Sequence, residues 1–199
     1  MERFYLELPS IERKEEALAY IQEFKEYNSN INGTGGLNRY LEKSNYEEWL
    51  DNAIKGMKKE YAESKGLVQS ATYFTIREED NKIVGMISLR YYLNDYLRHC
   101  GGHIGYSIRP TERRNGYAKI QLYMGLLKAK KINLDKVMVD CIDTNIGSEK
   151  TIQALGGEFE GTYYDEESKE TLKNYWINVD ESIGKYRDLY GKYVLIKKM

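Results

Sequence analysis

The sequence contains few residues of the kinds that cross-link, kink or anchor a chain. Its 199 residues include two cysteines and two prolines, and no apolar run is long enough to span a bilayer. The cysteines, Cys100 and Cys141, provide no disulfide framework and fit a reducing compartment. The first five residues lack the apolar core of a secretory signal. We therefore expect a cytoplasmic protein without a membrane partner.

The chain also lacks an excess of charge of either sign. Lys and Arg number 30 against 31 Asp and Glu, which gives a net charge of −1. Bulk electrostatics therefore favour neither nucleic acid nor an anionic membrane as a partner. The segment 109–136 is the exception, with eight basic residues and two acidic ones. Such a focused basic segment suits a small polyphosphate ligand, and a solvated helix face is the alternative.

Hydrophobic patterning predicts one domain in which helices and strands are mixed. The hydrophobic share of 41% is ordinary for a folded domain with a sizeable core. The predicted elements are helices at 11–27 and 45–64, a hairpin of strands 71–77 and 82–91, a strand before Pro110, a helix at 116–131, a strand at 136–142, a helix that stops at Gly156, and strands at 158–164 and 171–179. Beyond residue 180 the pattern allows a short helix and a last strand without placing them.

The stretch from Gly102 to Ala118 predicts a strand, a turn and the first turn of a helix. Apolar side chains alternate with small or polar ones between residues 103 and 108, and Pro110 ends the strand because it has no N–H to donate. Free N–H groups and the helix dipole converge near Gly116, where the helix begins. The sequence therefore predicts an anion-binding turn.

The order of these elements resembles that of the GNAT superfamily of acyl-CoA-dependent N-acetyltransferases. The family signature is Arg or Gln, two residues, Gly, one residue, then Gly or Ala, and Arg113 to Ala118 matches it. Ile108 and Pro110 stand where the family usually has an apolar residue and a proline. The resemblance covers residues 1–180 as a GNAT-like acetyltransferase domain. Residues 181–199 fall outside it, and we expect them to be a C-terminal extension that packs on the same domain.

The resemblance implies a fold and a co-substrate. The fold is α/β (α+β), a single GNAT-like domain whose central mixed, mostly antiparallel sheet is splayed between two parallel strands and flanked by helices. The co-substrate is acetyl-CoA, and no metal is implied. The residues implied to bind acetyl-CoA are Ile108 for the pantetheine arm, then Arg113, Arg114, Asn115, Gly116, Tyr117 and Ala118 for the pyrophosphate, and Asn145 and Ser148 in the loop after the next strand. A helix N-cap is the alternative role for Ser148.

Acetyl transfer to an amine needs a neutral amine, a stabilised oxyanion and a proton for the leaving thiolate. By resemblance the amine attacks directly in a ternary complex, so Cys141 is interpreted as core packing. His103 is the candidate general base because histidine titrates near neutral pH, and a satisfied polar group is the alternative interpretation. Many family members place a tyrosine seven residues after the Asn as general acid, and here that position is Ile152.

Two functions follow from the sequence. The first is an N-acetyltransferase whose acceptor is a small-molecule or peptide amine, with no nucleic-acid partner, and with a homodimer left open. The second is a non-catalytic acyl-CoA-binding or interaction module, because the usual tyrosine is missing. We expect the acceptor pocket to involve the N-terminal helices, the glycine-rich loop 28–36 and the last strands. His99, Cys100 and His103 have no second Cys/His cluster in register with them, so a zinc site is not expected.

Overall fold

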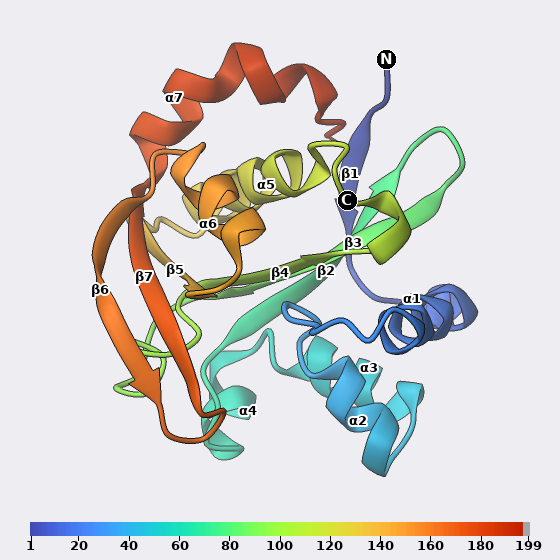
Figure 1. Cartoon of the computed structure of the whole chain (residues 1–199). Helices are drawn as coiled ribbons and strands as arrows, with labels where there is room; N and C mark the ends of the chain where they lie inside the picture. Colours follow the sequence, from blue (N-terminus) through green and yellow to red (C-terminus); the bar gives the residue numbers. More distant parts are fainter. Residues whose placement is uncertain (197–199) are drawn as a thin grey trace.

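Two antiparallel sheets form the centre of the computed structural model, which describes residues 1–196 (Figure 1). The first sheet has the order β1 (Phe4–Glu7), β2 (Ser70–Arg77), β3 (Lys82–Arg90) and β4 (Ile104–Ile108). The second has the order β5 (Lys136–Ile142), β7 (Glu170–Asn178) and β6 (Glu158–Asp165). The expected single mixed sheet is thus replaced by two sheets whose strands all pair antiparallel. The expected splay between two parallel strands is not confirmed: β4 and β5 share no ladder in the described chain, so no pairing defines their relative direction.

Helices cover the two faces of the first sheet (Figure 1). The helices are α1 (Lys14–Glu26), α2 (Leu37–Lys43), α3 (Tyr46–Lys55), α4 (Lys59–Ser64), α5 (Tyr117–Lys131), α6 (Ile146–Gln153) and α7 (Val179–Tyr190). On one face, Val84, Ile87 and Leu89 of β3 pack with α5 in a core that also contains β5, α6 and α7. On the other face, Phe74 and Ile76 of β2 pack with α1 and α3 in a second core.

Tertiary contacts explain where the sequence prediction of the helices fails. The predicted helix 45–64 is divided between α3 and α4. The carbonyl groups of Gly56 and Met57 accept hydrogen bonds from another segment instead of from the next helical turn. Ser70 N–H donates to Gly56 O (3.2 Å), and Gln69 Nε2 donates to Met57 O (2.8 Å). Short elements such as β1 and α2 have too few residues to show a period, and the sequence did not predict them.

The segment after residue 180 continues the main body of the fold. The predicted short helix is α7, which packs against α5, and Tyr190 lies beside Tyr123 with ring centroids 6.0 Å apart. The expected last strand is reduced to a single parallel bridge between Val194 and Phe4, with Leu195 N–H donating to Phe4 O (2.7 Å). Residues 197–199 of the predicted extension lie outside the described residues.

The two sheets meet where β4 and β5 approach each other. His103 N–H donates to Met138 O (2.7 Å), and Met138 N–H donates to Nδ1 of the His103 ring (2.9 Å). A Cβ on Gly102 would stand 2.5 Å from Met138 O, so a glycine is required for this approach. Past this junction, β4 and β5 belong to different sheets, and each leaves one edge without a ladder partner in the described part of the chain.

Candidate active site

One edge of β4 is free to bind a ligand through its backbone. Arg109 N–H donates to Val84 O of β3 (2.9 Å), so the odd-numbered residues of β4 bond to β3. Bonding alternates in an antiparallel pair, and therefore Tyr106 and Ile108 direct their N–H and C=O groups to the other side, toward β5. Ile108 O accepts a hydrogen bond from Arg113 Nε (3.2 Å). The remaining groups of this edge, above all the N–H groups of Tyr106 and Ile108, can pair with an extended ligand.

The free edge leads into an open turn at the start of α5. Arg114 and Gly116 both have left-handed backbones, with φ of 70° and 82°. Gly116 is the N-cap residue, no side chain caps the helix, and a Cβ added to Gly116 would meet no atom within 4 Å. The N–H groups of residues 116–118 thus face open space at the positive end of a 15-residue helix. This geometry suits a phosphate group.

Arg113, at the head of the predicted signature, holds the turn in place with its side chain. Its guanidinium donates to Ile108 O through Nε, and to Ser29 Oγ through Nη2 (2.8 Å). It also lies 5.2 Å from the ring centroid of Phe24 on α1. The side chain therefore links the turn to α1 and to loop 28–36.

The other residues of the signature present their backbone to the turn. Asn115 donates from Nδ2 to Glu112 O (3.3 Å), which stabilises the turn from within. The ring of Tyr117 is buried and packs against Phe4, with centroids 4.7 Å apart. The sequence had grouped Tyr117 with the pyrophosphate-binding residues, and the structure leaves its main chain for that role.

Glu112 links the turn to β2 and β3 through its carboxylate. Its carboxylate accepts a hydrogen bond from Arg77 Nη1 (2.8 Å) and one from Lys82 Nζ (2.7 Å), and its side chain is only 10% exposed. Burial alone would raise the pKa of Glu112, but the two cationic donors hold it below its usual value. No sequence pattern indicates this cluster, because its members come from β2, β3 and the turn.

Asn145 and Ser148 lie at the start of α6, the helix that follows β5 in the chain. Asn145 is the N-cap: its Oδ1 accepts the Ser148 N–H (3.0 Å) and its Nδ2 has no partner in the described chain. The alternative role for Ser148, an N-cap, thus belongs to Asn145. Ser148 Oγ instead shares a hydrogen bond with the Tyr106 hydroxyl (2.9 Å). Tyr106, which the sequence did not single out, connects β4 to α6.

His103 is buried at the junction of the sheets, and its geometry favours the interpretation as a satisfied polar group. Nδ1 already accepts the Met138 N–H, so the neutral ring carries its proton on Nε2 and has no free lone pair for a base. The ring packs edge-on to Trp176 at 6.0 Å. Burial, and next the positive charges of Arg90 and Arg98, lower the pKa of His103 to about 4.

We expect His103 to remain neutral well below the pH at which a free histidine titrates. In a His99→Gln variant, His103 is the one remaining histidine. Its ring resonances should show no titration between about pH 8 and about pH 5.5, whereas an unperturbed ring has a midpoint near 6.5. Proton NMR across this range provides the measurement. A midpoint above pH 6 would restore His103 as a candidate base.

Loop 28–36 covers the peptide between Gly105 and Tyr106. Gly33 packs so closely that a Cβ there would stand 2.5 Å from both Gly105 O and Tyr106 N, and its φ is +69°. Trp49 Nε1 donates to Gly35 O (3.0 Å) and holds the loop against α3. We expected this loop beside the acceptor pocket, and the structure places it against β4.

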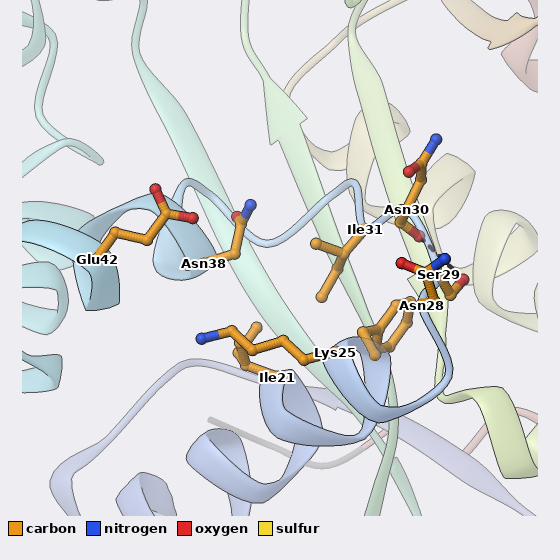
Figure 2. Close-up of a pocket in the computed structure, with 9 residues that line it drawn as sticks. Ile21, Lys25, Asn28, Ser29, Asn30, Ile31, Asn38 and Glu42 are labelled. Carbon is orange, nitrogen blue, oxygen red and sulfur yellow. Dashed lines mark hydrogen bonds between the residues drawn. The ribbon is translucent and has the colours of Figure 1, made fainter.

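A separate pocket opens between α1, the same loop and α2 (Figure 2). Its lining residues are Ile21, Phe24, Lys25, Asn28, Ser29, Asn30, Ile31, Asn38 and Glu42. No residue of the predicted acetyl-CoA set lines this pocket. Loop 28–36 therefore contacts β4 through Gly33 and lines the separate pocket through residues 28–31.

Comparison with known families identifies the fold. A family model described as "Acetyltransferase (GNAT) domain" matches residues 3–158. The chain belongs to the GNAT acetyltransferase family. It is therefore an acyltransferase, as its resemblance to the family implied. No curated protein matches this GNAT chain in sequence.

Solved structures share the fold of this GNAT domain at low sequence identity. The ribosomal-protein-S5-alanine acetyltransferase of Vibrio fischeri has a TM-score of 0.65 and 18% identity, over 91% of this chain and 96% of that one. The microcin C7 self-immunity acetyltransferase MccE, solved with acetyl-CoA and AMP, has a TM-score of 0.63 and 15% identity, over 88% and 92%. A spermidine N-acetyltransferase chimera from Vibrio cholerae and hSSAT has a TM-score of 0.58 and 12% identity, over 92% and 99%.

Residues 1–196 contain neither a membrane-spanning helix nor a group of side chains that could hold a metal ion. None of the helices described is both long and apolar enough to cross a membrane. Within the same residues, no three His, Cys, Asp or Glu side chains are grouped as a metal site would require.

Proposed function

We propose that this GNAT enzyme transfers an acetyl group from acetyl-CoA to a primary amine, by direct attack of the amine in a ternary complex. The observation that carries the proposal is the continuity of two open backbone surfaces, the free edge of β4 and the uncapped N-terminus of α5. An extended amide-bearing arm would pair with the first, and a pyrophosphate would meet the second.

The proposed donor site uses the residues that the signature indicated. The N–H group of Ile108 pairs with the pantetheine arm, and the N–H groups of residues 114–118 bind the pyrophosphate. Arg114 is exposed beside the turn and adds positive charge. Asn145 Nδ2 is the free donor for a pantetheine amide, and Ser148 supports it by fixing Tyr106.

The thioester is proposed to lie between β4 and β5. The chain passes from β4 to β5 through α5, and a crossover of this kind usually joins parallel strands. With β4 and β5 held together at His103 and Met138, the free edges beyond this point face each other. The Tyr106 N–H is the proposed donor to the oxyanion, because a fixed backbone donor stabilises the charge that develops on the carbonyl oxygen.

Calorimetry with acetyl-CoA tests the donor site. A Gly116→Glu variant should bind acetyl-CoA at least about 100-fold more weakly than the unmodified protein, because the new carboxylate enters the space proposed for the pyrophosphate. Gly66→Glu is the matched control, since Gly66 has φ +68° and equally open surroundings. Absence of binding to the unmodified protein, or equal binding by Gly116→Glu, would reject the donor site.

Turnover separates the enzyme from the binding module. Ile152 is fully buried at the position where the family often has its tyrosine, which is the observation that favours a non-catalytic role. Free CoA released from acetyl-CoA should depend on an added amine, and a panel of diamines, aminoglycosides and peptide N-termini provides the test. Binding of acetyl-CoA without amine-dependent release of CoA would favour the binding module.

A further inference from the structure

We infer that Asp140 is the general base of the transfer. Its carboxylate receives a proton from the ammonium group of the acceptor. The inference rests on the proposed function. It identifies the acceptor as a primary amine that arrives in its protonated, cationic form.

Asp140 lies on the face of β5 that looks away from α5. Val137, Val139 and Cys141 belong to the core beneath α5, and alternate residues of a strand point to opposite faces. Asp140 therefore points to the other side, where its carboxylate Oδ2 accepts the Gly101 N–H from the loop before β4. This is the side of the sheets to which His103 and loop 28–36 also belong.

The main chain of Asp140 also faces β4. Asp143 N–H donates to Thr171 O (2.9 Å), so odd-numbered residues of β5 bond to β7. Even-numbered residues direct their N–H and C=O groups to the free edge of β5. Met138 shows this directly, since its N–H and C=O both bond to His103. Asp140 is the next residue along this edge.

Gly105 stands opposite Asp140 in the proposed parallel arrangement of β4 and β5. The strands are joined at His103 and Met138, and two residues further along each strand come Gly105 and Asp140. Gly105 has no side chain to fill this face, and a Cβ on it would lie 3.4 Å from Gly33 Cα. Asp140, the Gly105 to Tyr106 peptide and Gly33 thus form three sides of the place where the amine would meet the thioester.

The carboxylate of Asp140 has one oxygen free for a ligand. Oδ2 is held by Gly101, whereas Oδ1 accepts no hydrogen bond from another described residue. Arg90 does not form an ion pair with Asp140 but donates from Nη1 to Gly101 O (2.7 Å) and Gly102 O (2.8 Å), which fixes the turn that orients the carboxylate. An ammonium group has three donors and matches a half-buried carboxylate of this kind.

The surroundings of Asp140 keep its proton affinity high. Burial raises the pKa of Asp140, the nearby positive charge of Arg90 opposes this, and the negative charge of Asp165 reinforces it. The titratable groups that interact electrostatically with Asp140 are Arg90 on β3, Asp165 on β6, Tyr106 on β4, Cys141 on β5, and Tyr96 and Cys100 in the loop before β4. A carboxylate with a raised pKa is a better proton acceptor at neutral pH.

The step balances without a further reactant. The ammonium nitrogen gives one proton to Asp140 Oδ1 and regains its lone pair. That lone pair attacks the thioester carbonyl carbon, the C–N bond forms, and the C–S bond breaks as the CoA thiolate leaves. The amide nitrogen loses its second proton to solvent, the thiolate is protonated from solvent, and Asp140 releases its proton to solvent before the next cycle.

The experiment compares Asp140→Asn with Asp135→Asn in the full chain. Asp140→Asn keeps the shape and the acceptor for the Gly101 N–H but removes the base. Asp135 is exposed, immediately before the same strand, and serves as the control. The kcat/KM for the amine should fall by about 10²-fold to 10⁴-fold in Asp140→Asn, with an unchanged Kd for acetyl-CoA and unchanged activity in Asp135→Asn.

A pH profile distinguishes a base from a structural residue. In the unmodified enzyme, kcat/KM should fall as pH drops through the pKa of Asp140, because only the carboxylate can take the proton. This acidic limb should disappear in Asp140→Asn and return in Asp140→Glu. Activity of Asp140→Asn within twofold of the unmodified enzyme, or an acidic limb that persists in it, would overturn the inference while leaving the proposed function intact. No turnover by the unmodified enzyme with any amine would reject the proposed function, and this inference with it.

Discussion

Replacing Gly33 by alanine is expected to destabilise the protein by about 2 to 5 kcal/mol. Two effects add: a left-handed backbone costs a residue with a Cβ about 1 to 2 kcal/mol, and forced overpacking costs about 1 to 3 kcal/mol more. The second effect is large here because the atoms that the new methyl would meet, Gly105 O and Tyr106 N, belong to the backbone of β4. A rigid, hydrogen-bonded strand cannot move aside as a flexible side chain could.

Gly66→Ala is the control for this prediction. Gly66 has nearly the same φ, +68° against +69° for Gly33, and nothing lies within 4 Å of the added Cβ. The free energy of unfolding of Gly66→Ala should fall by only about 1 to 2 kcal/mol, which is the backbone effect alone. Urea unfolding of both variants gives the two free energies. If Gly33→Ala loses no more than Gly66→Ala, then the loop does not press on β4 in solution.

Glu112→Gln is expected to cost about 2 to 4 kcal/mol, because it leaves two cations without their common partner. Arg77 and Glu112 are both well buried, with side-chain exposures of 14% and 10%. Removing one member of a buried ion pair typically costs about 3 to 5 kcal/mol, and the loss is smaller here because Arg77 keeps its second ion pair, with Asp80. The glutamine retains an acceptor oxygen, which reduces the expected loss somewhat.

The pH dependence of unfolding separates the charge of Glu112 from its shape. The pKa of Glu112 is lowered in the folded protein, so its stabilisation is complete above the unfolded pKa of about 4.3 and is lost as pH falls below it. Glu112→Gln should therefore flatten the acidic part of the stability curve. Glu78→Gln is the control, since the Glu78 to Arg3 pair is 37% and 47% exposed and should contribute less than about 1 kcal/mol. A parallel loss in both variants would contradict the role given to Glu112.

Long apolar segments of this chain were predictable because the signal lies in consecutive residues. The hairpin of β2 and β3, the helix α5 and the strand β5 are largely apolar segments bounded by polar or turn residues, and each lies where the sequence analysis predicted it. The division of the predicted helix 45–64 was not predictable in this way. It depends on Gln69 and Ser70, which bond to the carbonyls of Gly56 and Met57 only after the chain has folded.

The candidate site shows the same division. The turn from Arg113 to Ala118 was predictable, because it requires only a glycine immediately before a helix, and both features lie in consecutive residues. The contacts of Glu112, the hydrogen bond from Met138 N–H to His103 Nδ1 and the hydrogen bond from Gly101 N–H to Asp140 join segments from different parts of the chain. No single-sequence pattern contains that information, because these residues meet only in the folded chain.

The two unpaired inner edges also bear on how this fold avoids aggregation. An exposed strand edge can pair with another chain, but in the arrangement proposed above the free edges of β4 and β5 face each other. On the outside of the first sheet, Val194 and Leu195 cover β1. The outer strand of the second sheet, β6, carries Glu158 and Glu160 and an irregularity in register after Phe159. Charges and bulges of this kind discourage edge-to-edge pairing, so the chain can keep two backbone edges open for a ligand without presenting them to its neighbours.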